Sequence, residues 1–224
     1  MDWLILSWID GMRKSLTAAV IVAHPDDETI WAGGTVLKNS GWQWVFVSLC
    51  RGSDRDRAPR FIEAVHQLGG MGWIGDLDDG SEQLPLDEVI VQQTILSLLP
   101  NKDFDLLLTH SPHGEYTRHR RHEECGKAVT VLWENGLIRT KKLWMFAYGD
   151  SGKGGKDDLP QAIKSAHQIV QLPEDVWRRK RRIITGVYGF APETYEANIV
   201  MKEEAFWCFH SPADFQEWLK TEGR

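Results

Sequence analysis

Cysteine is scarce in this chain, and the few cysteines present form no pattern. The 224 residues contain Cys50, Cys125 and Cys208, which are widely spaced and include no Cys-x-x-Cys pair. An odd, scattered set excludes a disulfide framework and a thiolate zinc site. A sequence without such a framework is typical of a reducing compartment. We therefore expect a cytoplasmic protein.

An excess of positive charge and long apolar runs are also lacking. The chain carries a net charge of −6, which argues against nucleic acid as a partner. Segment 1–10 has an acidic start and an apolar stretch too short for a signal peptide or a stable membrane span. We expect an amphipathic helix there. Its Trp3, Leu4 and Trp8 would pack on the domain, or on a partner subunit of a homo-oligomer, more readily than on a membrane surface.

Two further segments carry charge or glycine without a clear function. The basic run at 178–182 follows Trp177 at helical spacing, so we expect a solvated helix face rather than a nuclear-targeting signal. The Gly- and Lys-rich stretch at 149–158 does not have the spacing of a P-loop. We expect it to be a mobile flap or surface linker.

The rest of the chain alternates between strand-like and helix-like segments. Strands are expected at 17–23, 44–49, within 69–80, at 104–109 and at 143–148, and helices at 57–68, 86–99 and 119–135. This alternation indicates βαβ units and a mostly parallel sheet. At this length one domain is expected. The prediction is a single α/β, Rossmann-like domain over 1–224, with helices on both faces of the sheet and the motif-bearing core at about 17–150.

The first chemical motif follows the first strand directly. The unbroken, β-branched run at 17–23 suits a buried central strand, and Pro25 ends it. Ligands of open α/β sheets bind outside the carboxyl ends of the strands, so His24, Asp26 and Asp27 would project to where a ligand is expected. The alternative is a plain strand-to-helix turn, in which solvated acids supply first-turn charge for the helix.

A second cluster lies far downstream, after the strand at 104–109. Four of the eight histidines are there: His110, His113, His119 and His122. His119 and His122 are three residues apart where a helical pattern begins, so they share one helix face. Surface histidines among arginines are the alternative for any one of them. Catalytic zinc needs three protein donors and an open position, which His24, Asp27 and one downstream histidine would supply.

The two segments together resemble the PIG-L family, also called LmbE-like, of zinc-dependent N-deacetylases. Its first motif, Ala-His-Pro-Asp-Asp-Glu, stands unchanged at 23–28 and continues into Gly-Gly-Thr at 33–35. Its second is a Gly-Asp-Tyr-like turn, then His-x-x-His and a glycine, here at 114–126. An Arg-rich helix ending in Leu-Gly, at 57–69, and Asp79-Gly80 also look familiar. The resemblance covers 17–150 well and the C-terminal third poorly.

Position by position, the resemblance implies that His24, Asp27 and His122 bind zinc and that Asp26 is the general base. His119 would be a non-ligand that supports the developing oxyanion in its protonated form. A His-His-Asp set also accepts other divalent transition metals. The substrate implied is a small molecule or glycoconjugate that carries an N-acetylglucosaminyl group.

Other positions have less defined roles. Arg57 and Asp79 are candidate substrate-binding residues, because helix starts and loops at these positions should lie near strand ends. A structural ion pair for Arg57 and an Asx turn for Asp79 are the alternatives. Trp31 stands where the family has small residues, so it would either narrow the entrance or pack the helix on the sheet. Lys180 is not followed by the histidine usual in the family, which leaves the back wall of the pocket undefined.

The sequence thus predicts a metal-dependent hydrolase, a zinc-dependent N-deacetylase that removes the acetyl group from an N-acetylated amino sugar or its conjugate. An amidase acting on a non-sugar amide with the same metal chemistry is one alternative. A catalytically silent, metal-bearing binding protein is another, although the complete set of ligands and base speaks against it.

Overall fold

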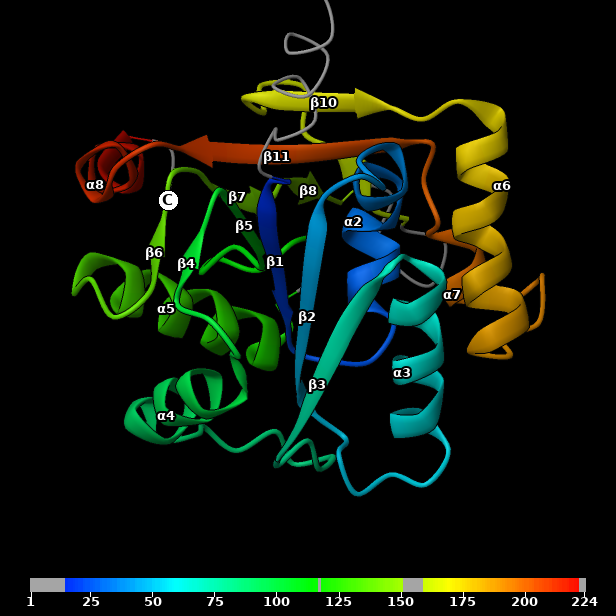
Figure 1. Ribbon diagram of the computed structural model, residues 1–224, viewed down its shortest axis with the longest axis horizontal. Helices are drawn as coiled ribbons and strands as arrows, with labels where there is room; N and C mark the ends of the chain where they lie inside the picture. The colour runs from blue at the N-terminus through cyan, green and yellow to red at the C-terminus, as the bar shows by residue number, and fades with distance from the viewer. Residues whose placement is uncertain (1–14, 117, 151–158, 222–224) are drawn as a thin grey trace, which may run out of the picture.

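A seven-stranded sheet forms the centre of the molecule. The computed structural model describes residues 15–116, 118–150 and 159–221 (Figure 1). The strands of the sheet are β1 (Thr17–Val22), β2 (Gln43–Cys50), β3 (Gly70–Leu77), β5 (Leu106–Thr109), β7 (Leu143–Phe146), β10 (Gln168–Gln171) and β11 (Glu203–Phe209). Their order is β10-β11-β7-β5-β1-β2-β3. The strands from β7 to β3 pair in parallel, whereas β11 and β10 pair antiparallel.

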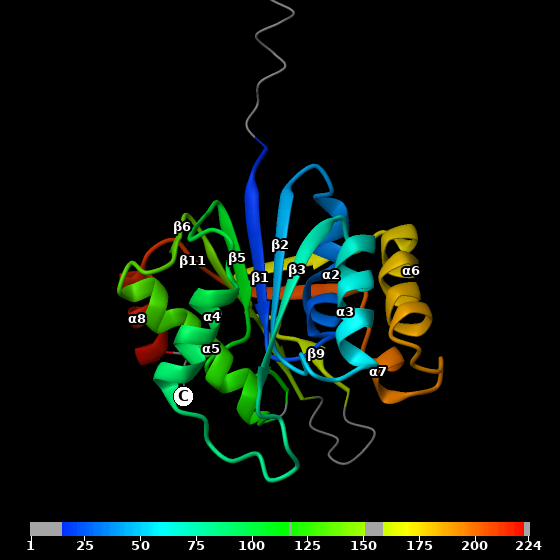
Figure 2. The same cartoon turned by 60° about the horizontal axis from the view of Figure 1, so that its bottom comes forward.

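Helices cover both faces of this sheet (Figure 2). On one side lie α4 (Glu88–Leu98), α5 (Arg120–Glu134) and α8 (Pro212–Thr221); on the other lie α2 (Asp27–Lys38), α3 (Arg57–Gln67) and α6 (Glu174–Arg182). Alternate side chains of β1 enter the two apolar cores, Ala19 and Ile21 on one face and Val20 on the other. A strand buried on both faces must be apolar throughout. The predicted Rossmann-like α/β fold with a mostly parallel sheet is confirmed.

One predicted strand is interrupted. The segment expected as a strand at 104–109 divides into β4 (Asp103–Phe104), which pairs with β6 (Arg139–Thr140), and β5. Asp105 lies between them, and its carboxylate accepts a hydrogen bond from the Thr17 backbone N–H at 2.9 Å. A side chain that takes a backbone donor in this way ends the regular ladder. A second small sheet joins β8 (Tyr148–Gly149) to β9 (Gln161–Ala162).

The C-terminal third contains elements that the sequence pattern did not predict. Strand β11 inserts beside β7, and β10 forms the sheet edge. After α6 the chain continues as a π-helical turn, η2 (Ile183–Val187), and then α7 (Tyr195–Asn198). None of the described helices is long and apolar enough to cross a membrane. The predicted N-terminal helix and most of the predicted flap at 149–158 lie outside the described residues.

The prediction of a solvated basic face for α6 was wrong at one position. Lys180 is fully buried, and its Nζ lies 2.7 Å from Glu204 Oε1 of β11, which is also fully buried. The Glu204 carboxylate also accepts the backbone N–H groups of Gly34 and Thr35, at 2.7 and 2.6 Å. A Cβ at Gly34 would lie 2.9 Å from this carboxylate and closer still to Leu172. The buried ion pair therefore joins α6, β11 and α2.

The strand order places a topological switch point at the carboxyl end of β1. The sheet extends from β1 to β2 and β3 on one side and to β5 and β7 on the other, so the connections leave β1 in opposite directions. Ligands of open α/β folds bind at such a switch point. The two histidine-bearing segments begin there, at His24 after β1 and at His110 after β5.

Candidate metal centre

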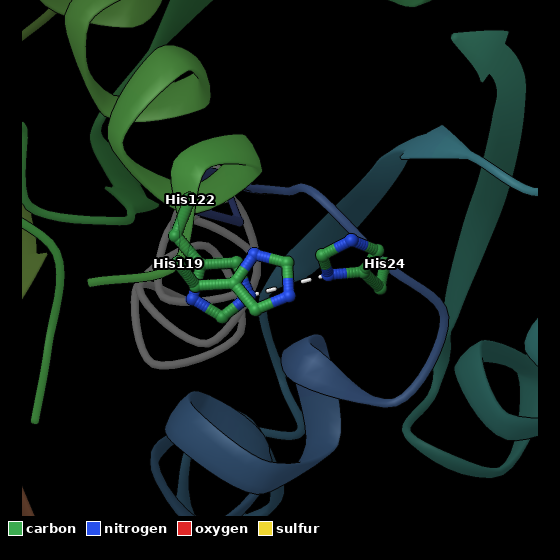
Figure 3. A group of neighbouring side chains, drawn as sticks. All are labelled: His24, His119 and His122. Atoms are coloured by element: carbon green, nitrogen blue, oxygen red, sulfur yellow. Dashed lines mark hydrogen bonds between the residues drawn. The ribbon is translucent and has the colours of Figure 1, made fainter. Parts of the chain in front are cut away.

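Three donor atoms from distant parts of the chain form a nearly equilateral triangle. His24 Nδ1 lies 3.2 Å from Asp27 Oδ2 and 3.2 Å from His122 Nε2. The remaining side, from His122 Nε2 to Asp27 Oδ2, measures 3.3 Å. Figure 3 shows the imidazoles of His24 and His122 pointing toward one another from the β1 loop and from α5. The structure therefore brings together the three predicted zinc ligands.

Local structure explains how each donor reaches this point. His24 is the second residue after β1, and Asp27 is the first residue of α2. Pro25 lies between them and its fixed φ ends the strand. His122 is in the first turn of α5, so its ring reaches past the strand ends. One tight turn and one helix start thus supply all three donors.

The triangle fits a tetrahedral zinc ion. Zinc–nitrogen and zinc–oxygen bonds of about 2.0–2.1 Å separate neighbouring donors in a tetrahedron by about 3.3 Å. The observed sides of 3.2–3.3 Å agree with this value. Three protein donors leave one position for water or substrate, which is the arrangement of catalytic rather than structural zinc sites. These residues could hold one divalent ion.

The outer nitrogen of each histidine donor faces a carboxylate. His24 Nε2 lies 3.2 Å from Asp79 Oδ1, and His122 Nδ1 lies 2.7 Å from Glu115 Oε2. Each carboxylate holds the ring proton on the outer nitrogen and leaves the lone pair of the inner nitrogen free for a metal. Burial works to raise the pKa of Glu115, but His110 and His122 outweigh it and lower this pKa to about 2. Glu115 is therefore an anion at neutral pH.

Asp27 is held equally firmly. Its Oδ1 accepts the indole N–H of Trp31 at 3.0 Å, and its Oδ2 accepts the His24 backbone N–H at 2.9 Å. Trp31 lies one helical turn after Asp27 and is 2% exposed. Of the two roles considered for Trp31, packing in the helix–sheet interface is the one observed. In addition it fixes the Asp27 carboxylate so that Oδ2 is directed at the two imidazoles.

Asp26, the predicted base, sits in a strained backbone conformation beside the triangle. Its φ is 104° and ψ is −31°, in a region that costs a residue other than glycine roughly 1–3 kcal/mol. Its Oδ2 contacts Arg57 Nη1 at 3.3 Å. Burial raises the pKa of Asp26 well above its ordinary value, the charges of Asp27 and Glu28 add to this, and Arg57 opposes it. This is the direction that a proton acceptor working near neutral pH requires.

Residues other than glycine with positive φ lie close to the candidate site. Within the described ranges the residues other than glycine with positive φ are Asp26, Arg51 and Gln83. The side chains of Arg51 and Gln83 both donate to Asp79, which in turn faces His24. Arg51 and Gln83 therefore belong to the network around the His24 ring, and Asp26 directly precedes the donor Asp27 in the chain. Clustered strain of this kind is typical of functional sites.

Both candidate substrate contacts face residues of the first motif, Asp79 facing His24 and Arg57 facing Asp26. Asp79 accepts from His24, Arg51 and Gln83, so its contacts are those of a residue that orients His24. The Arg57 guanidinium pairs with Asp26, and its Cζ lies 4.5 Å above the Phe190 ring. Both residues therefore lie near the strand ends, as predicted. Substrate contact by either one remains a prediction.

His119 occupies the N-cap position of α5 without a side-chain capping hydrogen bond, and its ring stacks on His122 with centroids 4.4 Å apart. Burial lowers the pKa of His119 to about 4, helped by the neighbouring His122 and His24. This speaks against the predicted protonated form; a neutral imidazole can still donate one N–H. Its Nδ1 is buried without a hydrogen-bond partner. His24, His119 and His122 also lie close enough to form a three-histidine donor set.

Two functional residues were not singled out from the sequence. Glu115 links His122 to the fully buried His110, whose Nδ1 it contacts at 2.9 Å. His110 Nε2 accepts the Ala23 backbone N–H at 3.1 Å and lies 3.4 Å from Asp27 Oδ2. The only local signal for these roles is a histidine directly after a buried strand, followed by an acid in a turn that contains glycine. That signal is too common to identify a site.

One family model spans both motif segments of this chain. Residues 19–133 match the family model described as "PIG-L: GlcNAc-PI de-N-acetylase". Uncharacterized protein L374 of Acanthamoeba polyphaga mimivirus is 26% identical over 145 residues, which span 58% of this chain and 60% of the viral protein. The chain thus matches less than two thirds of that relative's length.

Solved structures share the fold. N,N'-diacetylchitobiose deacetylase from Pyrococcus horikoshii superimposes with a TM-score of 0.65 at 16% identity, over 92% of this chain and 88% of that one. GalB, a 4-carboxy-2-hydroxymuconate hydratase from Pseudomonas putida, gives a TM-score of 0.55 at 14% identity, over 86% and 95% of the two chains. These identities show the fold alone, and the two proteins catalyse different reactions. The family match covers about half of this chain and includes both motif segments, so the chain belongs to the PIG-L family.

Proposed function

We propose that this protein is a zinc-dependent N-deacetylase that releases acetate from an N-acetylated amino sugar or its conjugate. The observation that carries the proposal is the triangle of His24 Nδ1, Asp27 Oδ2 and His122 Nε2, with sides of 3.2–3.3 Å. Asp26 is the residue before the donor Asp27, and its carboxylate is not one of the three donors. A general base needs a carboxylate that is free of the metal. The family's description as a GlcNAc-PI de-N-acetylase supports the substrate class, as does the fold shared with a diacetylchitobiose deacetylase.

His24, Asp27 and His122 would hold the metal. Zinc bound there would lower the pKa of water to about 7 and polarise the amide carbonyl. Asp26 takes the proton from the attacking water, because its carboxylate is free of the donor triangle and its pKa is raised by burial. Arg57 keeps that carboxylate oriented through its contact with Oδ2.

His119 and a second proton transfer by Asp26 complete the reaction. Negative charge develops on the carbonyl oxygen in the transition state, and a correctly placed N–H donor to it is worth about 3–4 kcal/mol. His119 supplies such a donor as a neutral imidazole, since its pKa is lowered to about 4. Asp26 then returns its proton to the leaving amine, so that it serves first as base and then as acid.

The proposal is tested by measuring acetate release. The purified protein, loaded with zinc, is incubated with N-acetylglucosamine conjugates and with acyl amino acids, and loss of an acetyl group is followed by mass spectrometry. We expect release from the sugar conjugates that stops in the presence of a chelator and returns with added zinc. Preferential release from acyl amino acids would favour a non-sugar amidase. A zinc-loaded protein that is inert on the whole panel would favour the silent binding protein.

A further inference from the structure

A tyrosine from the C-terminal third reaches the motif that follows β1. Tyr188, the residue after η2, is 4% exposed. Its hydroxyl donates to Glu28 Oε1 at 2.8 Å, across 160 positions of the chain. It lies in the segment after Lys180 in which the family histidine is missing. This hydrogen bond is therefore one way in which the C-terminal third takes part in the site.

Glu28 connects Tyr188 to Asp26 through hydrogen bonds. The Glu28 side chain is fully buried, and its Oε2 accepts the Asp26 backbone N–H at 3.0 Å. Its other oxygen receives the hydroxyls of Tyr188 and Thr29. Thr29 is the next residue in the same helix and moves with Glu28. Tyr188 is the contact that ties Glu28 to a separate element of the fold.

The backbone of Asp26 needs such support. It adopts φ 104°, and its side chain makes no capping hydrogen bond to α2. A residue held in this region returns to a commoner conformation unless its surroundings over-determine it. The hydrogen bond from the Asp26 N–H to Glu28 Oε2 constrains the peptide entering this residue. Rotation of that peptide would redirect the Asp26 carboxylate.

The same C-terminal segment also reaches the carboxylate side of Asp26. Phe190, two residues after Tyr188, packs under the Arg57 guanidinium with its ring 4.5 Å from Cζ. Arg57 in turn contacts Asp26 Oδ2. The segment at 188–190 therefore bears on Asp26 from two directions, through Glu28 at the backbone and through Arg57 at the side chain.

We propose that Tyr188 is a positioning residue for the reaction, which holds Asp26 in its working conformation through Glu28. This inference rests on the proposed function, in which Asp26 moves the proton. A tyrosine that only filled space in the core would need its ring and not its hydroxyl. The hydroxyl is therefore what an experiment must remove.

The test compares Tyr188→Phe with Tyr148→Phe. Both substitutions keep a buried ring and remove one hydrogen bond; Tyr148 donates to the Glu203 backbone carbonyl at 3.2 Å. For Tyr188→Phe we expect kcat to fall by about tenfold or more while KM stays within about twofold, because misplacement of a catalytic group costs turnover. Zinc content should remain one per chain. Tyr148→Phe should keep kcat within about twofold of the parent.

A second measurement does not depend on activity. In the metal-free protein, amide hydrogen exchange at Asp26 should be at least about tenfold faster in Tyr188→Phe than in the parent or in Tyr148→Phe, because a loosened Glu28 exposes this N–H. Glu28→Gln should lower kcat as well. Combining it with Tyr188→Phe should cost less than the product of the two single effects, since both act on one chain of contacts.

The failures of the two proposals are distinguishable. An active parent with unchanged kcat and unchanged Asp26 exchange in Tyr188→Phe would overturn the positioning role and leave the deacetylase intact. Equal loss of activity in both tyrosine variants would also overturn it, because a general loss of stability would then explain the result. An inert parent would refute the proposed function, while exchange at Asp26 would still decide whether Tyr188 supports this residue.

Discussion

Glu115→Gln should weaken metal binding although Glu115 is not itself one of the three donors. Its two carboxylate oxygens accept from His110 Nδ1 at 2.9 Å and from His122 Nδ1 at 2.7 Å. A glutamine has one oxygen and one NH₂ group, so it can accept from only one of the two rings. The other ring would have to move its proton to Nε2. In His122 that nitrogen is the donor atom that faces His24 Nδ1, and in His110 it faces the Ala23 N–H.

The size of the effect follows from these contacts. Loss of a carboxylate that orients a histidine ligand typically costs 10- to 100-fold in metal affinity, or about 1.4–2.7 kcal/mol. We expect the dissociation constant for zinc to rise by this factor, as measured by competition with a chromophoric chelator. Glu134→Gln, on the same helix α5 but exposed, is the matched control and should leave the affinity unchanged. A dissociation constant for Glu115→Gln within twofold of the parent would refute the reasoning.

The same variant has a pH signature in the metal-free protein. The pKa of Glu115 falls from 4.5 to about 2 on folding, since the charges of His110 and His122 outweigh burial. A lowered carboxyl pKa contributes stability that is complete above the unfolded value, near 4.5, and is lost as pH falls toward 2, here about 3 kcal/mol. The difference in unfolding free energy between the parent and Glu115→Gln should therefore shrink between pH 5 and pH 2.5. A constant difference over that range would contradict the assignment.

Three other substitutions test separate parts of the molecule. Asp26→Asn should keep one zinc per chain by elemental analysis but lower kcat by about 10²–10⁴-fold, and near-parental turnover would exclude Asp26 as the base. Trp31→Phe should raise the zinc dissociation constant by about tenfold, because Asp27 loses a hydrogen bond from its Oδ1; unchanged affinity would show that Asp27 needs no such support. Lys180→Met should lower the free energy of unfolding in urea by about 3–5 kcal/mol by leaving Glu204 buried and unpaired, and a loss below about 1 kcal/mol would contradict the importance of that pair.

The secondary structure of the first two thirds could be predicted because its signals are local. The unbroken apolar run of β1 indicates burial on both faces without reference to any other segment. The histidine, proline and acids at 24–27 follow it directly, so one tight turn brings most of the site together. The helix at 120–134 was equally clear from its apolar spacing.

The downstream ligand and the C-terminal elements were harder to predict for a physical reason. Four histidines between 110 and 122 were chemically equivalent candidates, and spacing alone cannot say which ring nitrogen lies 3.2 Å from His24. Strand β11 depends on pairing with β7, and the four-residue strand β10 depends on pairing with β11, rather than on patterns of their own. The basic run at 178–182 indicates a solvent-exposed helix face, because the sequence does not show that Lys180 pairs with the buried Glu204.

The sequence by itself determined the Rossmann-like α/β class, the place of the candidate site at the end of β1 and the residue types of the candidate metal centre, because hydrophobic periodicity and a contiguous motif are properties of short segments. Only the tertiary structure decided that Glu115 and Asp79 orient the two histidines, that Lys180 is buried against Glu204, and that Tyr188 supports Glu28. These contacts join residues up to 160 positions apart, and the energies that select them depend on distance and burial in the folded chain.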